Sequence, residues 1–568
     1  MAMTEKSQKE IVLLQACLVL MCCNIHIVTG TEDSPPVLVT KYGQLMGKNV
    51  RVKETTRTVS AYLGIPFAEP PLNQLRFAPP QPPKAWTGLR DATMYPPLCL
   101  QDLDHAKKLS DLYGGKFPPL KSSEDCLYLN IYSPVKPGDS ARLPVMVWIH
   151  GGGYLLGGAS CYDGSSLAAL GSVVVVAIQY RLGILGFLST GSGITAENVG
   201  MLDQVFALQW IQENIASFGG DPEAVTIFGE SAGGMSVFFH MLSPKSSGLF
   251  HRAICQSGVG LFPMFWLRNP KPAAQVIARS AGCFTDDSAA LLDCFRNKTS
   301  EEIVAASATM GELLLMPSLD GEFIPKNPEE LLQEMAFNNV PYIIGMNNHE
   351  FGWMLPHFMF PPRWDSGMTR ETTSMILSSI LKKADLPTFA LEIINDEYFG
   401  DMEDPIEIRQ TFVELLSDML LGFPAIKTTR YHSDAGFPVY FYEFQHRPSV
   451  YRESRPEFVK ADHFDEVGFV FGAPFWTEDI QILNKSTAEE RELSRTMIKY
   501  WTNFAKNGNP NGDGLLDWPT YTSTEEYMQF NLNLTLNSTL KKHRLRFWTE
   551  VFPKKIEAGM NLYEHAEL

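Results

Sequence analysis

Basic residues are scarce in this chain relative to acidic ones. Its 568 residues include 47 lysines and arginines against 64 aspartates and glutamates, which gives a formal net charge of -17. A field of that sign repels nucleic acid phosphates, so we expect no nucleic acid partner. Internal repeats and low-complexity tracts are also lacking. With 45% hydrophobic and 20% charged residues, the composition is typical of a globular enzyme and not of a disordered chain.

Long hydrophobic runs are equally rare, and the one near the N-terminus predicts a leader. Lys6 and Lys9 precede an apolar run over residues 11–23, which fits a secretory signal peptide better than a membrane span of roughly 20 residues. We expect residues 1–30 to be a signal peptide, with an uncleaved signal anchor as the alternative. No linker divides the rest, so residues 31–568 are predicted to form a single domain.

The chain has nine cysteines, three of which lie in the predicted leader. The other six can form disulfides in an oxidising lumen, but spacing alone does not fix their pairing. The simplest local pairs are Cys99 with Cys126 and Cys283 with Cys294. Cys255 lies in an apolar stretch, where a buried free thiol is expected.

The C-terminus carries a second targeting signal. The last four residues read HAEL and resemble the KDEL and HDEL type of retrieval address. Together with a signal peptide, they predict residence in the endoplasmic reticulum lumen and a retrieval receptor as a partner. If they are an ordinary solvated tail, the protein is secreted instead.

Apolar runs and helical patterns alternate along the chain. Buried strands are predicted at residues 143–149, 173–178, 224–228, 342–344 and 439–444. Residues 201–215 have the spacing of an amphipathic helix, and residues 352–425 read as a helical excursion from the sheet. This order predicts an α/β fold with a doubly wound, mostly parallel sheet.

A candidate nucleophile lies between a predicted strand and a predicted helix. Residues 229–233 read GESAG, and a chance G-x-S-x-G in so long a chain has odds of roughly one in five. The context makes the motif specific, because a sharp strand-to-helix turn needs glycines around its serine. Ser231 is therefore the predicted nucleophile, and the pattern predicts the α/β-hydrolase fold.

A glycine-rich loop follows the strand at residues 143–149. It reads HGGG over residues 150–153, the pattern of an oxyanion loop. We expect the backbone N–H groups of Gly152, Gly153 and Ala232 to stabilise the negative charge of a tetrahedral intermediate.

A serine nucleophile also needs a base and an orienting acid, which in this fold follow in the order serine, acid, histidine. Glu350 comes just after a later strand, and Asp320 is the competing acid, although it reads better as a turn residue. Spacing does not separate His446 from His463 as the base. Activity is expected to fall as this histidine is protonated, around its ordinary pKa of about 6.5.

Two further motifs resemble a known family. Residues 218–222 read FGGDP, and residues 123–130 read SEDCLYLN; with GESAGG they are similar to the type-B carboxylesterase and cholinesterase family. The resemblance runs from about Val37 to the C-terminus. It implies Glu350 as the acid and His463 as the base, and it implies the disulfides Cys99–Cys126 and Cys283–Cys294.

The resemblance also narrows the activity. Cholinesterases use a tryptophan on the first disulfide loop to bind a cation, and no tryptophan lies between Cys99 and Cys126. Adhesion members have lost the serine, which this chain keeps. The chain most resembles the vertebrate liver- and intestine-type carboxylesterases of the endoplasmic reticulum and the avian medium-chain fatty acyl-CoA hydrolases.

The expected reaction is therefore hydrolysis of a small, neutral, apolar ester through an acyl-enzyme, with thioesters as further substrates and without a metal or cofactor. A binding or adhesion protein on a hydrolase scaffold and a lipase are the alternatives. The oligomeric state stays open. Glycosylation sequons occur at Asn297, Asn484, Asn533 and Asn537.

Overall fold

The computed structural model describes residues 34–112, 114–117, 121–193, 196–308, 315–477 and 480–566. For residues 562–566 it describes the backbone alone. The predicted signal peptide, residues 1–30, lies outside the described residues. Contacts divide the chain into Met1–Pro35 and one compact unit, Pro36–Leu568. The fold described below is that of the larger unit.

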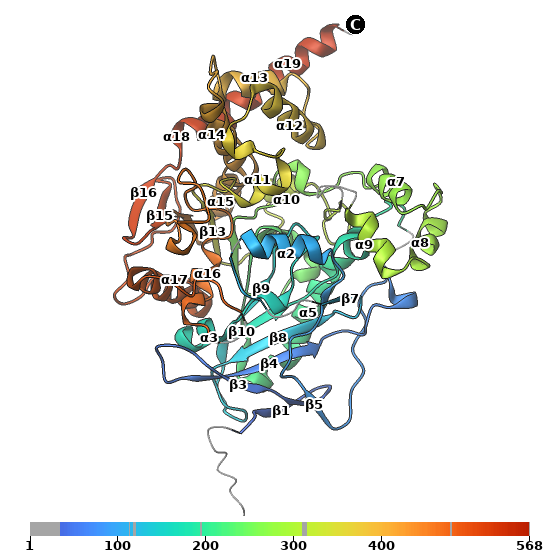
Figure 1. Ribbon diagram of the computed structural model, residues 1–568, viewed down its shortest axis with the longest axis vertical. Coiled ribbons are helices and arrows are strands. Elements are labelled where there is room, and N and C mark those ends of the chain that lie inside the picture. Colours follow the sequence, from blue (N-terminus) through green and yellow to red (C-terminus); the bar gives the residue numbers. More distant parts are fainter. Residues whose placement is uncertain are drawn as a thin grey trace, which may run out of the picture. The chain divides into compact units, whose positions relative to one another are not determined.

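An 11-stranded sheet runs through this unit, and its middle strands are parallel (Figure 1). In spatial order the parallel strands are β10 (Val174–Ile178), β9 (Leu143–Ile149), β11 (Gly220–Glu230), β12 (Arg252–Gln256), β13 (Tyr342–Asn347), β14 (Val439–Phe444) and β15 (Glu526–Phe530). The five strands predicted from the sequence are all among them, and the predicted parallel sheet is confirmed.

Antiparallel strands extend the sheet at both edges. On one side these are β8 (Tyr128–Ser133), β4 (Thr58–Pro66) and β3 (Lys48–Arg51), and on the other side β16 (Thr535–Ser538). A separate sheet contains β1 (Val37–Thr40), β2 (Gly43–Met46) and β5 (Leu89–Asp91), and β6 (Leu98–Cys99) pairs with β7 (Ser122–Ser123).

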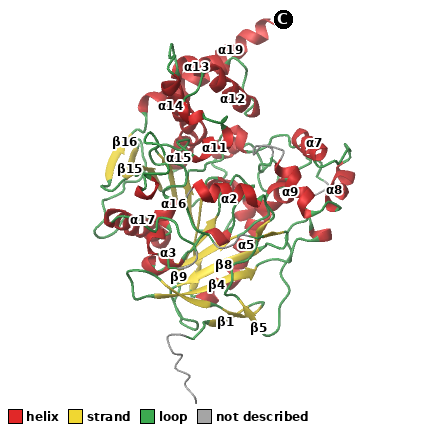
Figure 2. Cartoon of the chain, viewed as in Figure 1, coloured by secondary structure: helices red, strands yellow, loops and turns green. Residues whose placement is uncertain are grey.

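Helices cover both faces of the sheet because alternate side chains of its strands are apolar on both sides (Figure 2). Val145 and Val147 of β9 pack in the core that includes α5 and α6. Met146 and Trp148 pack in the opposite core, which includes α3 and α17. The bounds of these helices are α3 (Ser165–Gly171), α5 (Val199–Asn214), α6 (Ala232–Leu242) and α17 (Ala488–Asn507).

The predicted helical excursion after β13 is present. It consists of α11 (Met354–Met359), α12 (Arg370–Lys383), α13 (Ala390–Tyr398), α14 (Pro405–Leu416), a π-helical turn (Ser417–Gly422) and α15 (Phe423–Asp434). In Figure 1, α12, α13 and α14 lie together, and α13 contacts the C-terminal helix α19 (Phe552–Ala566).

The remaining helices are short and belong to the loops of the sheet. They are α2 (Leu103–Leu112), α4 (Gly183–Phe187), α7 (Lys271–Ser280), α8 (Ser288–Arg296), α9 (Ser300–Ala308), α10 (Pro328–Gln333), α16 (Val467–Val470) and α18 (Lys542–Arg546). Among the described residues, no helix has both the length and the apolar character that crossing a bilayer requires.

Candidate active site

Ser231 is the single residue between β11 and α6. Its φ of 56° lies in the left-handed region that non-glycine residues rarely adopt. The two motif glycines make this turn possible. A Cβ on Gly229 would lie 2.5 Å from the carbonyl oxygen of Gly233, and one on Gly233 would lie 2.0 Å from the carbonyl oxygen of Ile149. The motif is therefore a steric requirement of the turn that carries the serine.

The HGGG loop packs directly against this turn. A Cβ on Gly151 would lie 2.6 Å from the carbonyl oxygen of Glu230 and 3.0 Å from the Cβ of Ser231. Gly152 and Gly153 have φ values of 103° and 63°, which glycine adopts at no steric cost. Within the described ranges, no backbone or side-chain acceptor takes their N–H groups.

His463 and Glu350 meet in the interior below this loop. Nδ1 of His463 donates a hydrogen bond of 2.6 Å to Oε2 of Glu350, and both residues are buried. The other carboxylate oxygen of Glu350 accepts the N–H of Asn347 at 2.7 Å. The Nδ2 of Asn347 donates to the carbonyl of Asp462 at 2.6 Å. The acid loop after β13 and the histidine loop at residues 461–466 are thus bonded together.

Glu230, to which the sequence reasoning gave no role, also contacts the histidine. Its Oε1 lies 3.0 Å from Nε2 of His463, and the Glu230 side chain is buried. No sequence pattern marks this contact except that Glu230 directly precedes Ser231. It places the imidazole between two carboxylates.

Buried carboxylates therefore dominate the electrostatics of the site. Burial raises the pKa of Glu230. Burial, together with the charges of Glu230 and Glu350, raises the pKa of Glu466 to about 8. For His463, burial acts to lower the pKa, but the same two carboxylates outweigh it and hold that pKa well above its ordinary value. The expected loss of activity around pH 6.5 therefore moves to higher pH.

The competing candidates lie in other surroundings. Nε2 of His446 lies 2.9 Å from Oε1 of Glu490, a residue of α17. Oδ1 of Asp320 accepts the backbone N–H groups of Glu322, Phe323 and Ile324, which is the turn role read from the sequence.

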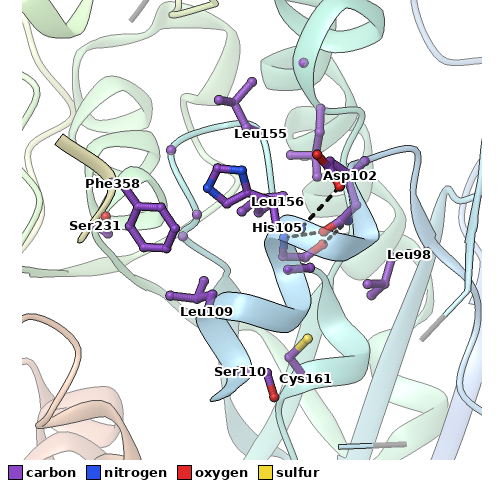
Figure 3. A pocket seen from close by; sticks show the side chains of 18 of the residues that line it. Leu98, Asp102, His105, Leu109, Ser110, Leu155, Leu156, Cys161, Ser231 and Phe358 are labelled. Atoms are coloured by element: carbon purple, nitrogen blue, oxygen red, sulfur yellow. Dashed lines mark hydrogen bonds between the residues drawn. The ribbon is translucent and has the colours of Figure 1, made fainter. Parts of the chain in front are cut away.

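A cavity of about 270 Å³ opens onto Ser231, His463 and the HGGG loop. Its walls are largely apolar and come from α2, α4, α9 and α11. Figure 3 shows Leu109, Leu155 and Phe358 among the side chains that line the cavity together with Ser231. Met354 and Leu355 belong to an apolar stretch that begins at Phe351, and both line the cavity. A second apolar stretch at residues 262–266 packs in the core instead.

Two disulfides join the pairs that the resemblance implies. Cys99–Cys126 has an S–S length of 2.01 Å, and Cys283–Cys294 one of 1.98 Å. The first closes the loop that carries α2, a wall of the cavity. Cys255 is a buried free thiol, and Cys161, also free, lines the cavity.

The four sequon asparagines, Asn297, Asn484, Asn533 and Asn537, are all exposed. Within the described ranges, no cluster of three or more histidine, cysteine, aspartate or glutamate side chains is arranged to hold a metal ion.

The sheet order and the serine turn after β11 define an enzyme fold of the α/β-hydrolase class. The chain belongs to the carboxylesterase family: the model of the Carboxylesterase family matches residues 34–548. It is a carboxylic-ester hydrolase.

Curated relatives match almost the whole chain. The medium-chain fatty acyl-CoA hydrolase precursor of Anas platyrhynchos is 48% identical over 529 residues, 92% of this chain and 94% of the duck protein. The cocaine esterase of Homo sapiens is 46% identical, over 96% of this chain and 97% of the human protein. Liver carboxylesterase 1 of Oryctolagus cuniculus is 44% identical, over 95% and 97%.

Proposed function

We propose that Ser231, His463 and Glu350 form the catalytic triad of a carboxylesterase that hydrolyses neutral, apolar esters to an alcohol and a carboxylate. The observation that carries the proposal is the 2.6 Å hydrogen bond from His463 to Glu350 beside a cavity that Ser231 also lines. Together the three residues supply the nucleophile, base and orienting acid that acyl transfer needs.

One hydrogen bond supports a definite order of proton transfers in this proposal. Because Nδ1 of His463 donates to Glu350, Nε2 is the nitrogen that takes the proton of Ser231 as its Oγ attacks the carbonyl carbon. The imidazolium then protonates the leaving alcohol, and the acyl-enzyme forms. Water, deprotonated by the same nitrogen, hydrolyses that intermediate and releases the acid.

The backbone N–H groups of Gly152, Gly153 and Ala232 stabilise the oxyanion in this proposal. Each such donor contributes about 3 kcal/mol when it is aimed at the charge that develops. Two observations support this role. Among the described residues, no acceptor takes the N–H groups of Gly152 and Gly153, and Ala232 is the first residue of α6.

The cavity supports apolar acyl or alcohol groups as the preferred substrate parts. Leucine, isoleucine and phenylalanine side chains line it, and burial of apolar substrate surface contributes roughly 25 cal/mol per Å². The similarity to the duck acyl-CoA hydrolase supports thioesters as further substrates, since the same attack on a carbonyl carbon cleaves them.

A panel of esters, amides and acyl-CoA thioesters, tested on the wild type and Ser231→Ala, tests the proposal. We expect kcat to fall by roughly a millionfold in the variant and labelling by a fluorophosphonate probe to disappear. Retained turnover in Ser231→Ala contradicts the assignment. An unlabelled wild type indicates a binding protein, and activity that rises sharply above the solubility limit of the substrate indicates a lipase.

We also propose that residues 1–30 are a cleaved signal peptide, that residues 31–568 form one catalytic domain, and that the terminal HAEL binds a retrieval receptor in the endoplasmic reticulum. The exposed sequons support luminal glycosylation. Deleting the last four residues should move the enzyme into the culture medium. Unchanged retention contradicts the retrieval role.

A further inference from the structure

Asp462 directly precedes His463 in the chain. His463 bonds Glu350, whereas Asp462 bonds the backbone at the start of α11. Its Oδ1 accepts the N–H of Trp353 at 2.9 Å, and its Oδ2 accepts the N–H of Met354 at 2.9 Å. Trp353 directly precedes α11 and Met354 is its first residue. A carboxylate at this end stabilises the helix through hydrogen bonds and the helix dipole. The Asp462 side chain is fully buried.

α11 is a wall of the substrate cavity. Met354, Leu355 and Phe358 all line it, and the ring of Phe358 stacks on that of His105 with centroids 4.9 Å apart (Figure 3). His105 belongs to α2, another wall. A shift at the start of α11 therefore changes the shape of the substrate cavity.

Asp462 belongs to a buried charge cluster. Nη1 of Arg455 lies 2.8 Å from both carboxylate oxygens of Asp465 and 3.8 Å from Oδ2 of Asp462. Oδ2 of Asp465 accepts the N–H of Asp462 at 2.8 Å. The guanidinium offsets part of the cost of burying two carboxylates.

We propose that Asp462 is a positioning residue that couples the catalytic loop of His463 to the cavity wall formed by α11, and so sets the preference for long acyl or alcohol groups. The inference rests on the proposed function of Ser231 and His463. It goes beyond that function because it assigns substrate selectivity to a residue outside the cavity lining.

A pair of matched substitutions separates this role from a general structural one. Asp462→Asn keeps the size of the side chain but cannot accept both N–H groups of α11. Asp465→Asn removes a carboxylate of the same cluster, yet Asp465 bonds Arg455 and the Asp462 N–H instead of α11. The readout is the ratio of kcat/KM for a long-chain ester to that for the matching acetate, with active sites counted by fluorophosphonate titration.

We expect Asp462→Asn to lower this ratio by about tenfold, the effect of one lost charge-assisted hydrogen bond, mainly through a higher KM for the long ester. Asp465→Asn should leave the ratio within about twofold of the wild type. A ratio that is unchanged in Asp462→Asn, or that falls equally in both variants, overturns the proposal. Fluorophosphonate labelling tests the nucleophile separately, because it should be lost in Ser231→Ala and kept in both aspartate variants.

The pH dependence of the same ratio in the wild-type enzyme provides a second test, which does not require any variant to fold. Burial raises the pKa of Asp462 to about 7, with Arg455 opposing the rise and Asp465 adding to it. Below that pH the protonated carboxyl holds α11 less well, so the long-to-short ratio should fall between about pH 8 and pH 6. Protonation of His463, and of Glu230 and Glu466 beside it, acts on the chemistry of both esters and cancels in the ratio. A ratio independent of pH contradicts the proposal.

Discussion

Nε2 of His463 lies 3.0 Å from Oε1 of Glu230, the residue that directly precedes the candidate nucleophile. The strand-to-helix turn thus presents a carboxylate to the imidazole of the proposed base. The carboxylate favours the protonated, cationic histidine, whereas general-base catalysis needs the neutral one. In the proposed mechanism, this competition sets the pH range of activity.

Replacing Glu230 by glutamine should extend activity to lower pH. Removing the charge lowers the pKa of His463, which the two carboxylates hold above its ordinary value. Because only the neutral imidazole accepts the serine proton, the acid limb of kcat/KM should move down by about one pH unit. A pH profile of kcat/KM for a neutral ester measures this. An acid limb that stays in place or moves up would show that Glu230 does not set the histidine's protonation.

Replacing Glu350 by glutamine should reduce kcat by about ten thousandfold without unfolding the protein. The amide can donate where the carboxylate accepts, so it favours the wrong imidazole tautomer and does not stabilise the imidazolium. Steady-state kinetics on a soluble ester measure the loss. Asp320→Asn is the matched control, because Asp320 accepts the N–H groups of a turn and the Nδ2 of Asn198 and is not among the described residues that line the cavity with His463 and Ser231. It should change kcat less than about threefold. Equal losses in the two variants would contradict the assignment of the acid.

The parallel strands were predictable because burial on both faces leaves continuous apolar runs. β9 and β14 have the predicted bounds. β11 begins four residues earlier than predicted, because Gly220 already pairs with Leu143 of β9 before a register shift that ends at Val225. The mostly polar residues between them leave no apolar run to detect. The edge strand β3 buries a single side chain, Val50, and leaves no apolar run to detect.

The site was predictable where local backbone geometry dictates residue type. The turn at Ser231 requires its glycines, so the motif is visible in the sequence. The contact between Glu230 and His463 joins residues far apart in the chain and requires no special residue type. The choice between His446 and His463 came from family resemblance, because both follow β14 in the sequence and only the tertiary fold separates them.

Removing the disulfide Cys99–Cys126 by two serine substitutions should affect both stability and substrate binding. Opening a loop with a sequence separation of 27 costs about 3–4 kcal/mol in the free energy of unfolding. Since that loop carries α2, KM for large esters should also rise. Denaturant unfolding and steady-state kinetics measure the two effects.

The second disulfide is the control for that experiment. Cys283–Cys294 closes a shorter loop, with a separation of 11, and its removal costs about 3 kcal/mol. The helix it holds, α8, does not line the cavity. Its loss should therefore lower stability without raising KM, and a similar rise in KM for both double variants would mean that the effect is general loosening.

Gly233→Ala should abolish activity through sterics alone. The new Cβ would lie 2.0 Å from the carbonyl oxygen of Ile149 and 2.8 Å from the carbonyl carbon of His150, and backbone atoms of a central strand cannot move aside cheaply. We expect a loss of about 3 kcal/mol or more in the free energy of unfolding, and no fluorophosphonate labelling in the folded fraction. Gly248→Ala is the control for an added Cβ that meets no other atom, since nothing lies within 4 Å of it. The φ of 76° at Gly248 adds a backbone strain that Gly233, inside α6, does not have. Gly248→Ala should cost about 1–2 kcal/mol and leave labelling intact. Normal labelling of Gly233→Ala would mean that the serine turn tolerates separation from β9, and the steric account of the motif would then be wrong.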